Sequence, residues 1–133
     1  MNPIKKIFFK RKRNATVTNS NSGKPFDEMY DDTGVFQYTV DGFVITHGNL
    51  TLSVNWEDIQ QILVYKIDRL TIDEIAMDIV LKETNFTITE ELPGWYQFVL
   101  KTKEVFPSIP KEWDIEIIWP AFATNLKVIY KKG

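Results

Sequence analysis

The sequence predicts a mainly β domain of the α+β type: a curved antiparallel sheet with one packed helix and two further strands after it. Two observations predict this class. Apolar and polar residues alternate in most segments between residues 35 and 131, which is typical of strands with one buried face. Apolar side chains at helical spacing occur convincingly in one segment alone, residues 93–106.

Three strands are expected first, at residues 35–40, 43–47 and 50–54. Asp41-Gly42 favours a two-residue hairpin turn between the first two, because both central positions of such a turn require positive φ. Gly48-Asn49 favours the second turn. The three strands should therefore form a meander.

Three more strands are expected at residues 59–67, 75–81 and 85–90. In the first of these, period-two spacing places Leu63, Tyr65 and Ile67 on one face together with Ile59. In the second, Ile75, Met77, Ile79 and Leu81 share a face opposite Asp78, and in the third Phe86 and Ile88 point inward.

The single helix is expected over residues 93–106, since a proline suits a first helical turn and Pro107 follows the last apolar residue. Residues 113–119 alternate as a half-buried strand would, and Pro120 ends the alternation. Residues 125–131 should form the last strand, with Leu126, Val128 and Tyr130 inward.

Residues 1–26 are expected to be a basic, disordered arm, and residues 27–133 a single globular domain. The first 24 residues hold seven basic and no acidic side chains, whereas the remainder holds nine basic and eighteen acidic ones. We therefore expect the domain to repel nucleic acid. The apolar run at residues 7–9 is too short for a signal peptide, so the cytoplasm is the expected location.

Residues that carry catalytic chemistry are scarce. The chain has no cysteine and one histidine, His47, so neither a Cys-His pair nor a two-histidine metal site can form. No glycine-rich phosphate loop is present. We therefore expect no catalytic residues, no cofactor and no metal, and a small hydrolase is the least favoured function.

The most concentrated polar feature follows the predicted strand 59–67. We hypothesise that its acidic side chains bind a basic partner beside apolar anchors, because charge gives rate and orientation while apolar contacts give affinity. The proposed contact residues are Asp68, Asp73, Glu74 and Asp78, with Tyr65, Leu70 and Ile72 as anchors. The alternative is a solvated hairpin loop in which Asp68 and Asp73 cap turns.

Two resemblances extend this interpretation. Trp56-Glu57-Asp58-Ile59 entering a strand, with one helix after a run of antiparallel strands, resembles the bacterial pleckstrin-homology-like domains over residues 33–106. That resemblance implies a split barrel with the helix at one end. The residues Tyr65-Lys66-x-Asp68, Asp73-x-Ile75 and Pro93-Gly94-Trp95 resemble small bacterial proteins, some of which are immunity partners of secreted toxins.

The sequence thus favours a non-enzymatic protein-binding module, most concretely an immunity-type inhibitor of a basic toxin. The alternative is a pleckstrin-homology-like peripheral module at the inner face of the membrane. In that case anionic lipid would be held by the basic arm while the apolar residues from Ile7 insert shallowly. The lipid-binding residues would be Lys5, Lys6, Phe8, Phe9, Lys10, Arg11, Lys12 and Arg13.

Overall fold

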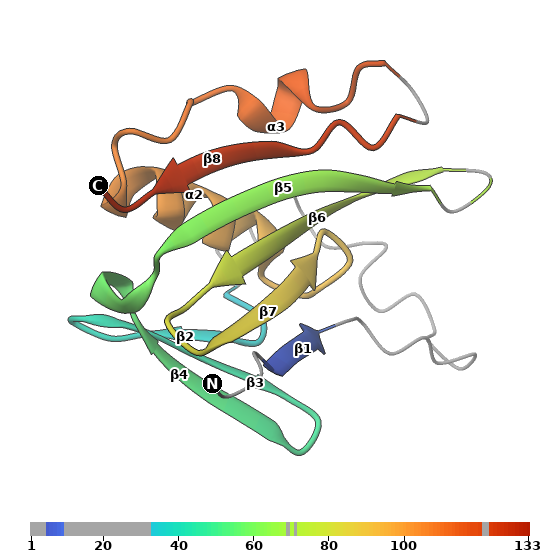
Figure 1. The fold of residues 1–133 in the computed structure, drawn as a ribbon. Helices are drawn as coiled ribbons and strands as arrows, with labels where there is room; N and C mark the ends of the chain where they lie inside the picture. Colours follow the sequence, from blue (N-terminus) through green and yellow to red (C-terminus); the bar gives the residue numbers. More distant parts are fainter. Residues whose placement is uncertain (1–4, 10–32, 69, 71, 121–122) are drawn as a thin grey trace.

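The computed structural model describes residues 5–9, 33–68, 70, 72–120 and 123–133. These residues form a mainly β structure with one main helix, α2 (Trp95–Val105), which confirms the predicted class. The strands form two sheets, whereas the sequence predicted one curved sheet. Figure 1 shows the larger sheet in front of α2 and the smaller sheet below it.

The smaller sheet contains β2 (Phe36–Tyr38), β3 (Gly42–His47) and β4 (Leu50–Asn55) in antiparallel order β2-β3-β4. These are the three strands of the predicted meander. The first turn is shifted by one residue from the predicted one. Thr39 N donates to Gly42 O at 2.9 Å, so the central residues of the turn are Val40 and Asp41 instead of Asp41 and Gly42. A Cβ on Gly42 would collide with the carbonyl oxygen of Val54, so this glycine permits close strand approach.

The larger sheet has the order β1-β7-β6-β5-β8. Its strands are β1 (Lys5–Phe9), β5 (Gln61–Asp68), β6 (Asp73–Val80), β7 (Thr84–Thr89) and β8 (Lys127–Lys131). All neighbouring pairs are antiparallel except β1 and β7, which run parallel. Strands β5, β6 and β7 correspond to the three strands that were predicted at residues 59–67, 75–81 and 85–90.

Strand β1 differs from the expectation of a disordered arm. Its residues pair with β7 from Lys5 opposite Thr84 to Phe9 opposite Ile88. The pairing satisfies backbone groups along the edge of β7, which would otherwise be open. The prediction of disorder is therefore wrong for residues 5–9, while residues 10–26 lie outside the described residues.

The core lies between the two sheets and α2, and aromatic rings fill much of it. Phe98 of α2 is fully buried, with its ring centroid 4.4 Å from that of Phe36 and 4.9 Å from that of Phe43. The ring of Trp56 lies 4.9 Å from that of Phe43, between centroids. These contacts fix the smaller sheet against the helix.

The segment predicted as a strand at residues 113–119 is instead the short helix α3 (Trp113–Glu116) and a following turn. Trp113 and Ile117 are buried, whereas Ile115 and Trp119 are exposed. A four-residue spacing between buried residues matches a helical turn, although the same sequence also fits period two. The strand prediction was wrong because alternation over few residues satisfies both periods.

Two predicted strand faces are also corrected. In β5 the buried side chains are Ile62, Val64 and Lys66, so the predicted inward residues Leu63, Tyr65 and Ile67 lie on the less buried face. The buried residue of β8 is Ile129, whereas Val128 in the strand and Leu126 just before it are exposed. The predicted inward residue Tyr130 is half-buried and packs on the core beside Phe106. The pairing of β5 with β8 shifts register between Ile62 and Leu63, and this irregularity changes the face that the final strand buries.

The short 3-10 helix η1 (Trp56–Asp58) connects the last strand of the smaller sheet to the first of the larger one. Trp56 is buried at this junction, while Glu57 and Asp58 are exposed. One side of η1 therefore packs on the core, and the other carries charged side chains outward.

Candidate functional site

The acidic hairpin predicted from sequence corresponds to the connection between β5 and β6. Asp68 is exposed, and its Oδ1 accepts a hydrogen bond from Leu70 N at 2.8 Å. Leu70 has a φ of 75°, and its side chain is 90% exposed. Asp68 therefore caps the turn, as the alternative interpretation expected, beside a side chain that projects into solvent.

Asp73 forms an ion pair inside the molecule. Its Oδ2 lies 3.4 Å from Nζ of Lys66, which is 4% exposed. The same ammonium donates to the carbonyl oxygens of Ile118, at 2.8 Å, and Pro120. Asp73 thus helps to hold a buried lysine that fastens the segment after α3 to β5.

Glu74 and Asp78 lie on the face of β6 opposite to Asp73. Glu74 is 1% exposed. Asp78 Oδ1 accepts hydrogen bonds from the hydroxyls of Tyr65, at 2.9 Å, and Thr87, at 2.6 Å. Burial, with the hydrogen bond and negative charge of Asp78, raises the pKa of Tyr65 to about 12.

The predicted contact residues consequently do not form one exposed acidic surface. Only Asp68, Leu70 and Ile72 are exposed, at the tip of the hairpin. The carboxylates of Asp73 and Asp78 have partners on opposite faces of β6, so they are not presented together. Period-two alternation explains this separation, because residues an odd number of positions apart in a strand point to opposite faces.

The residues of the lipid-binding alternative divide into two groups. Lys5, Lys6, Phe8 and Phe9 belong to β1, whose backbone is paired with β7. Lys10, Arg11, Lys12 and Arg13 lie outside the described residues. The shallow insertion of the first group would have to occur from a strand of the larger sheet.

His47 lies at the end of β3, opposite Leu50. Among the described residues there is no group of three or more His, Cys, Asp or Glu side chains that could hold a metal ion. No helix within the described ranges is long and apolar enough to cross a membrane.

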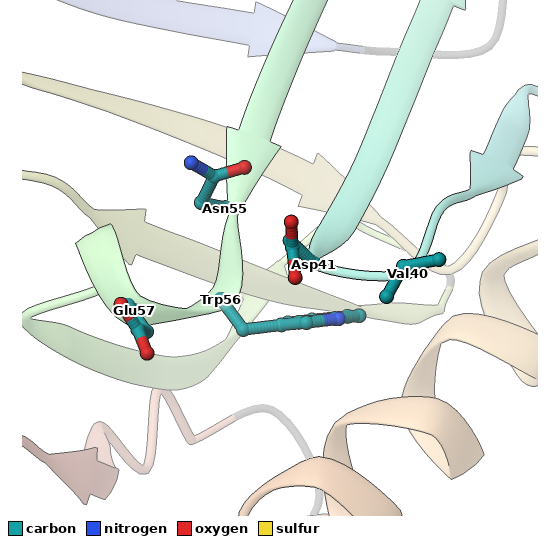
Figure 2. A pocket seen from close by; sticks show the side chains of 5 residues that line it. All are labelled: Val40, Asp41, Asn55, Trp56 and Glu57. Carbon is teal, nitrogen blue, oxygen red and sulfur yellow. The ribbon is translucent and has the colours of Figure 1, made fainter.

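A hollow of about 400 Å³ lies at the junction of the two sheets. Its lining residues are Val40, Asp41, Asn55, Trp56 and Glu57 (Figure 2). Figure 2 shows the Trp56 indole lying beneath Val40 and Asp41, with Glu57 and Asn55 to one side. The hollow therefore combines an aromatic ring with two carboxylates and an amide.

Strand register brings these residues together. Gly42 pairs with Asn55 across the β3–β4 ladder, and Trp56 N donates to Asp41 O at 2.9 Å. The turn after β2 therefore lies directly against the start of η1. Because a glycine at position 42 allows β3 and β4 to approach closely, the residues on either side of the ladder can line one hollow.

A second hollow, also of about 400 Å³, adjoins the first through Glu57. It is lined by Glu57, Asp58, Gln60, Leu81, Lys82, Glu83, Thr84 and Lys132. Lys132 Nζ donates to the backbone carbonyl of Glu57, which leaves the Glu57 carboxylate outside that bond. The second hollow thus extends the first from η1 to the β6–β7 turn.

Four exposed carboxylates surround these two hollows, and we call this set the acidic end. It consists of Asp41, Glu57, Asp58 and Glu83. None of the four forms an ion pair with another residue in the part of the chain that the structure describes. Their negative charge is therefore available to a partner.

The sequence contained both parts of the first hollow without linking them. Asp41 was interpreted only as a turn residue, and Trp56-Glu57-Asp58 only as the entrance to a strand. Pairing β3 with β4 in the predicted hairpin would have placed position 42 opposite position 55. That register is the signal that could have found the first hollow.

An apolar surface lies elsewhere, where the turn after α3 runs beside the start of β8. Asn125 Nδ2 donates to the carbonyl oxygens of Ile117, at 3.3 Å, and Trp119, at 3.1 Å. The exposed side chains are Ile115, Ile118, Trp119, Leu126 and Val128. Nearby Asp114 and Glu116 form ion pairs with lysines, so this surface offers little net charge to select a basic partner.

Comparisons with known proteins give no match: no protein-family model, no curated protein and no solved structure resembles the chain closely enough to be reported.

Proposed function

We propose that this chain is a non-enzymatic module that binds a basic protein, and that the acidic end is its contact surface. The observation that carries the proposal is the gathering of Asp41, Glu57, Asp58 and Glu83 around two adjoining hollows without ion pairs to the described residues. Concave surfaces with convergent polar groups are the usual form of a binding site.

Charge complementarity supports a basic partner. From residue 25 onward the chain holds nine basic and eighteen acidic side chains, so its general field favours encounter with a cation. At the acidic end, four carboxylates without ion pairs to the described residues outnumber the two lysines, Lys82 and Lys132, that line the second hollow. Electrostatic complementarity of this kind speeds association and sets the orientation of the complex.

An apolar side chain is also present at the rim, which a binding surface needs for affinity. Val40 is 99% exposed and stands beside Asp41 in the turn after β2. Burying it against a partner would remove apolar area from water. The acidic end therefore offers both attraction and an anchor, whereas the hairpin tip offers a single exposed acid, Asp68.

The resemblance to immunity partners makes a basic toxin the most concrete candidate for the partner. We also propose, as the finer form of the fold, a pleckstrin-homology-like split barrel. It is supported by the packing of Phe98 of α2 against Phe36 and Phe43 of the smaller sheet.

The test begins with capture of a partner by the immobilised full chain from cells of its own organism, followed by identification and purification of that partner. Binding of the purified pair is then compared between wild type and the charge reversal Asp58→Lys with Glu83→Lys. We expect at least about a tenfold loss of affinity at low salt, which corresponds to about 1.4 kcal/mol.

A matched reversal controls for net charge. Glu104→Lys with Glu116→Lys changes the charge equally at exposed positions that line neither hollow. This variant should bind within about threefold of wild type, since exposed charges away from a contact act weakly. An acidic partner, or equal loss in both variants, would overturn the proposal.

A further inference from the structure

The first hollow has unused hydrogen-bonding capacity of two kinds. Asp41 and Glu57 provide carboxylate acceptors that form no ion pair with the described residues. Trp56 is 8% exposed, and its indole N–H donates to no acceptor among the described residues. The Asn55 side chain is exposed and likewise forms no hydrogen bond within the described part of the chain.

The second kind of group is the indole N–H of Trp56, a residue that is more than nine-tenths buried. Its indole N–H is not among the fully buried polar atoms that lack a partner in the described residues, so this donor is open to the hollow and can reach a ligand. Carboxylates attract cations, but an indole N–H can only donate. A ligand suited to all of these groups must therefore be cationic at one point and offer an acceptor at another.

We propose that the hollow binds a basic side chain together with a carbonyl oxygen of the peptide segment that carries it. The carboxylates of Asp41 and Glu57 hold the guanidinium or ammonium group, and the Trp56 N–H donates to the carbonyl. The exposed Val40 packs on the aliphatic stem, which long basic side chains keep on apolar surface. This inference rests on the proposed function, because it names the chemistry that a basic partner presents.

The size of the hollow agrees with such a ligand. At about 400 Å³ it lies in the lower part of the range of about 300 to 1,000 Å³ that is usual for small-ligand sites. It can therefore take one side chain and its peptide unit, and the rest of a partner must spread over the second hollow.

The experiment titrates the ¹⁵N-labelled full chain with three short capped peptides that have arginine, lysine or citrulline between two glycines. Citrulline keeps the shape of arginine and removes its charge. The readout is the indole N–H signal of Trp56, and Trp119, which is 72% exposed and outside the hollow, is the internal reference. We expect a saturable shift of the Trp56 signal with a Kd of about 1 mM for a cationic peptide, which is typical of a single-residue contact.

The arginine and lysine peptides distinguish the two possible cations. A planar guanidinium binds carboxylates in a bidentate manner, so the larger shift with arginine would identify that group, and the reverse would identify an ammonium. Either result supports the inference if the citrulline peptide binds at least about tenfold more weakly. Equal binding of citrulline, or no saturation by about 10 mM, overturns it.

Variants tie the binding to the hollow. Asp41→Asn with Glu57→Gln should weaken the cationic peptides at least about tenfold, whereas Glu104→Gln with Glu116→Gln should change binding less than about twofold. Unchanged binding in the first pair overturns the inference. In one outcome the peptides fail to bind while the double variant Asp58→Lys with Glu83→Lys still lowers the affinity for the purified partner. In that case the inference is wrong and the proposed function stands.

Discussion

The Lys66 ammonium lies 2.8 Å from the carbonyl oxygen of Ile118, and this contact joins the middle of β5 to a segment 52 residues further along the chain. A second carbonyl, from Pro120, and the carboxylate of Asp73 complete its surroundings. A buried ammonium needs such partners because its charge is costly to remove from water.

Replacing this lysine should destabilise the fold. Lys66→Met keeps the aliphatic stem but removes the ammonium that contacts two carbonyls and Asp73, so we expect a loss of about 3 kcal/mol in the free energy of unfolding. Urea denaturation followed by circular dichroism measures it. Lys101→Met removes an ammonium that pairs with the exposed Glu104 and lies 5.7 Å from the ring centroid of Tyr38, and it should cost about 1 kcal/mol or less. Similar losses of unfolding free energy in both variants would contradict the role of Lys66 in holding the segment after α3 against β5.

Truncation of the central helix residue should be equally costly. Phe98 is fully buried among Phe36, Phe43 and Trp56, so Phe98→Ala should lose about 3 to 5 kcal/mol of unfolding free energy. Tyr96→Ala on the same helix removes a ring that is 46% exposed and should cost much less. A loss under about 1 kcal/mol for Phe98→Ala would mean that the helix does not pack as described.

Gly42 allows a direct test of the strand approach that forms the first hollow. A methyl group at this position meets the backbone carbonyl of Val54, which cannot rotate away, so Gly42→Ala should cost about 2 kcal/mol or more. Gly48→Ala is the comparison, because its Cβ meets nothing within 4 Å and only its φ of 63° is unfavourable. That variant should cost about 1 kcal/mol. Thermal unfolding of the two proteins gives the order, and a reversed order would refute the close approach.

The burial of Tyr65, together with its contact to Asp78, predicts an alkaline transition. The folded pKa of Tyr65 is raised from 10.0 to about 12, so the stability linked to its protonated form is present below pH 10 and is lost as pH rises toward 12. Asp78→Asn keeps an acceptor but removes the negative charge, so the pKa of Tyr65 should fall toward its ordinary value. Carbon-13 NMR of labelled tyrosine measures it, with Asp68→Asn as the control. An unchanged pKa in Asp78→Asn would show that the carboxylate has no part in the shift.

Local patterns predicted most of the strands and the main helix because each signal lies within one element. The meander from β2 to β4 and the helix α2 follow from alternation, turn residues and a helical stripe. Trp113 and Ile117 show where this reasoning fails, since their spacing fits both a strand and one helical turn. Only the surrounding core, which buries these two and leaves Ile115 exposed, decides between them.

The candidate site was harder to predict because it depends on contacts between elements. The acids at positions 68, 73, 74 and 78 are close in sequence, yet burial and pairing separate them in the structure. Asp41 and Glu57 are distant in sequence, yet they line one hollow. Charge clustering along the chain is therefore a poor guide to a binding surface when strand faces alternate.

The parallel pairing of β1 with β7 has a consequence for synthesis of the chain. Lys5 leaves the ribosome long before its pairing partner Thr84, and at about 5 to 20 residues per second the delay is on the order of ten seconds. During that time the backbone groups of β1 cannot reach their final acceptors and donors. Among the strands in the described ranges, β1 waits longest for its pairing partner to be synthesised. It can cover the edge of β7 only after β7 has been made.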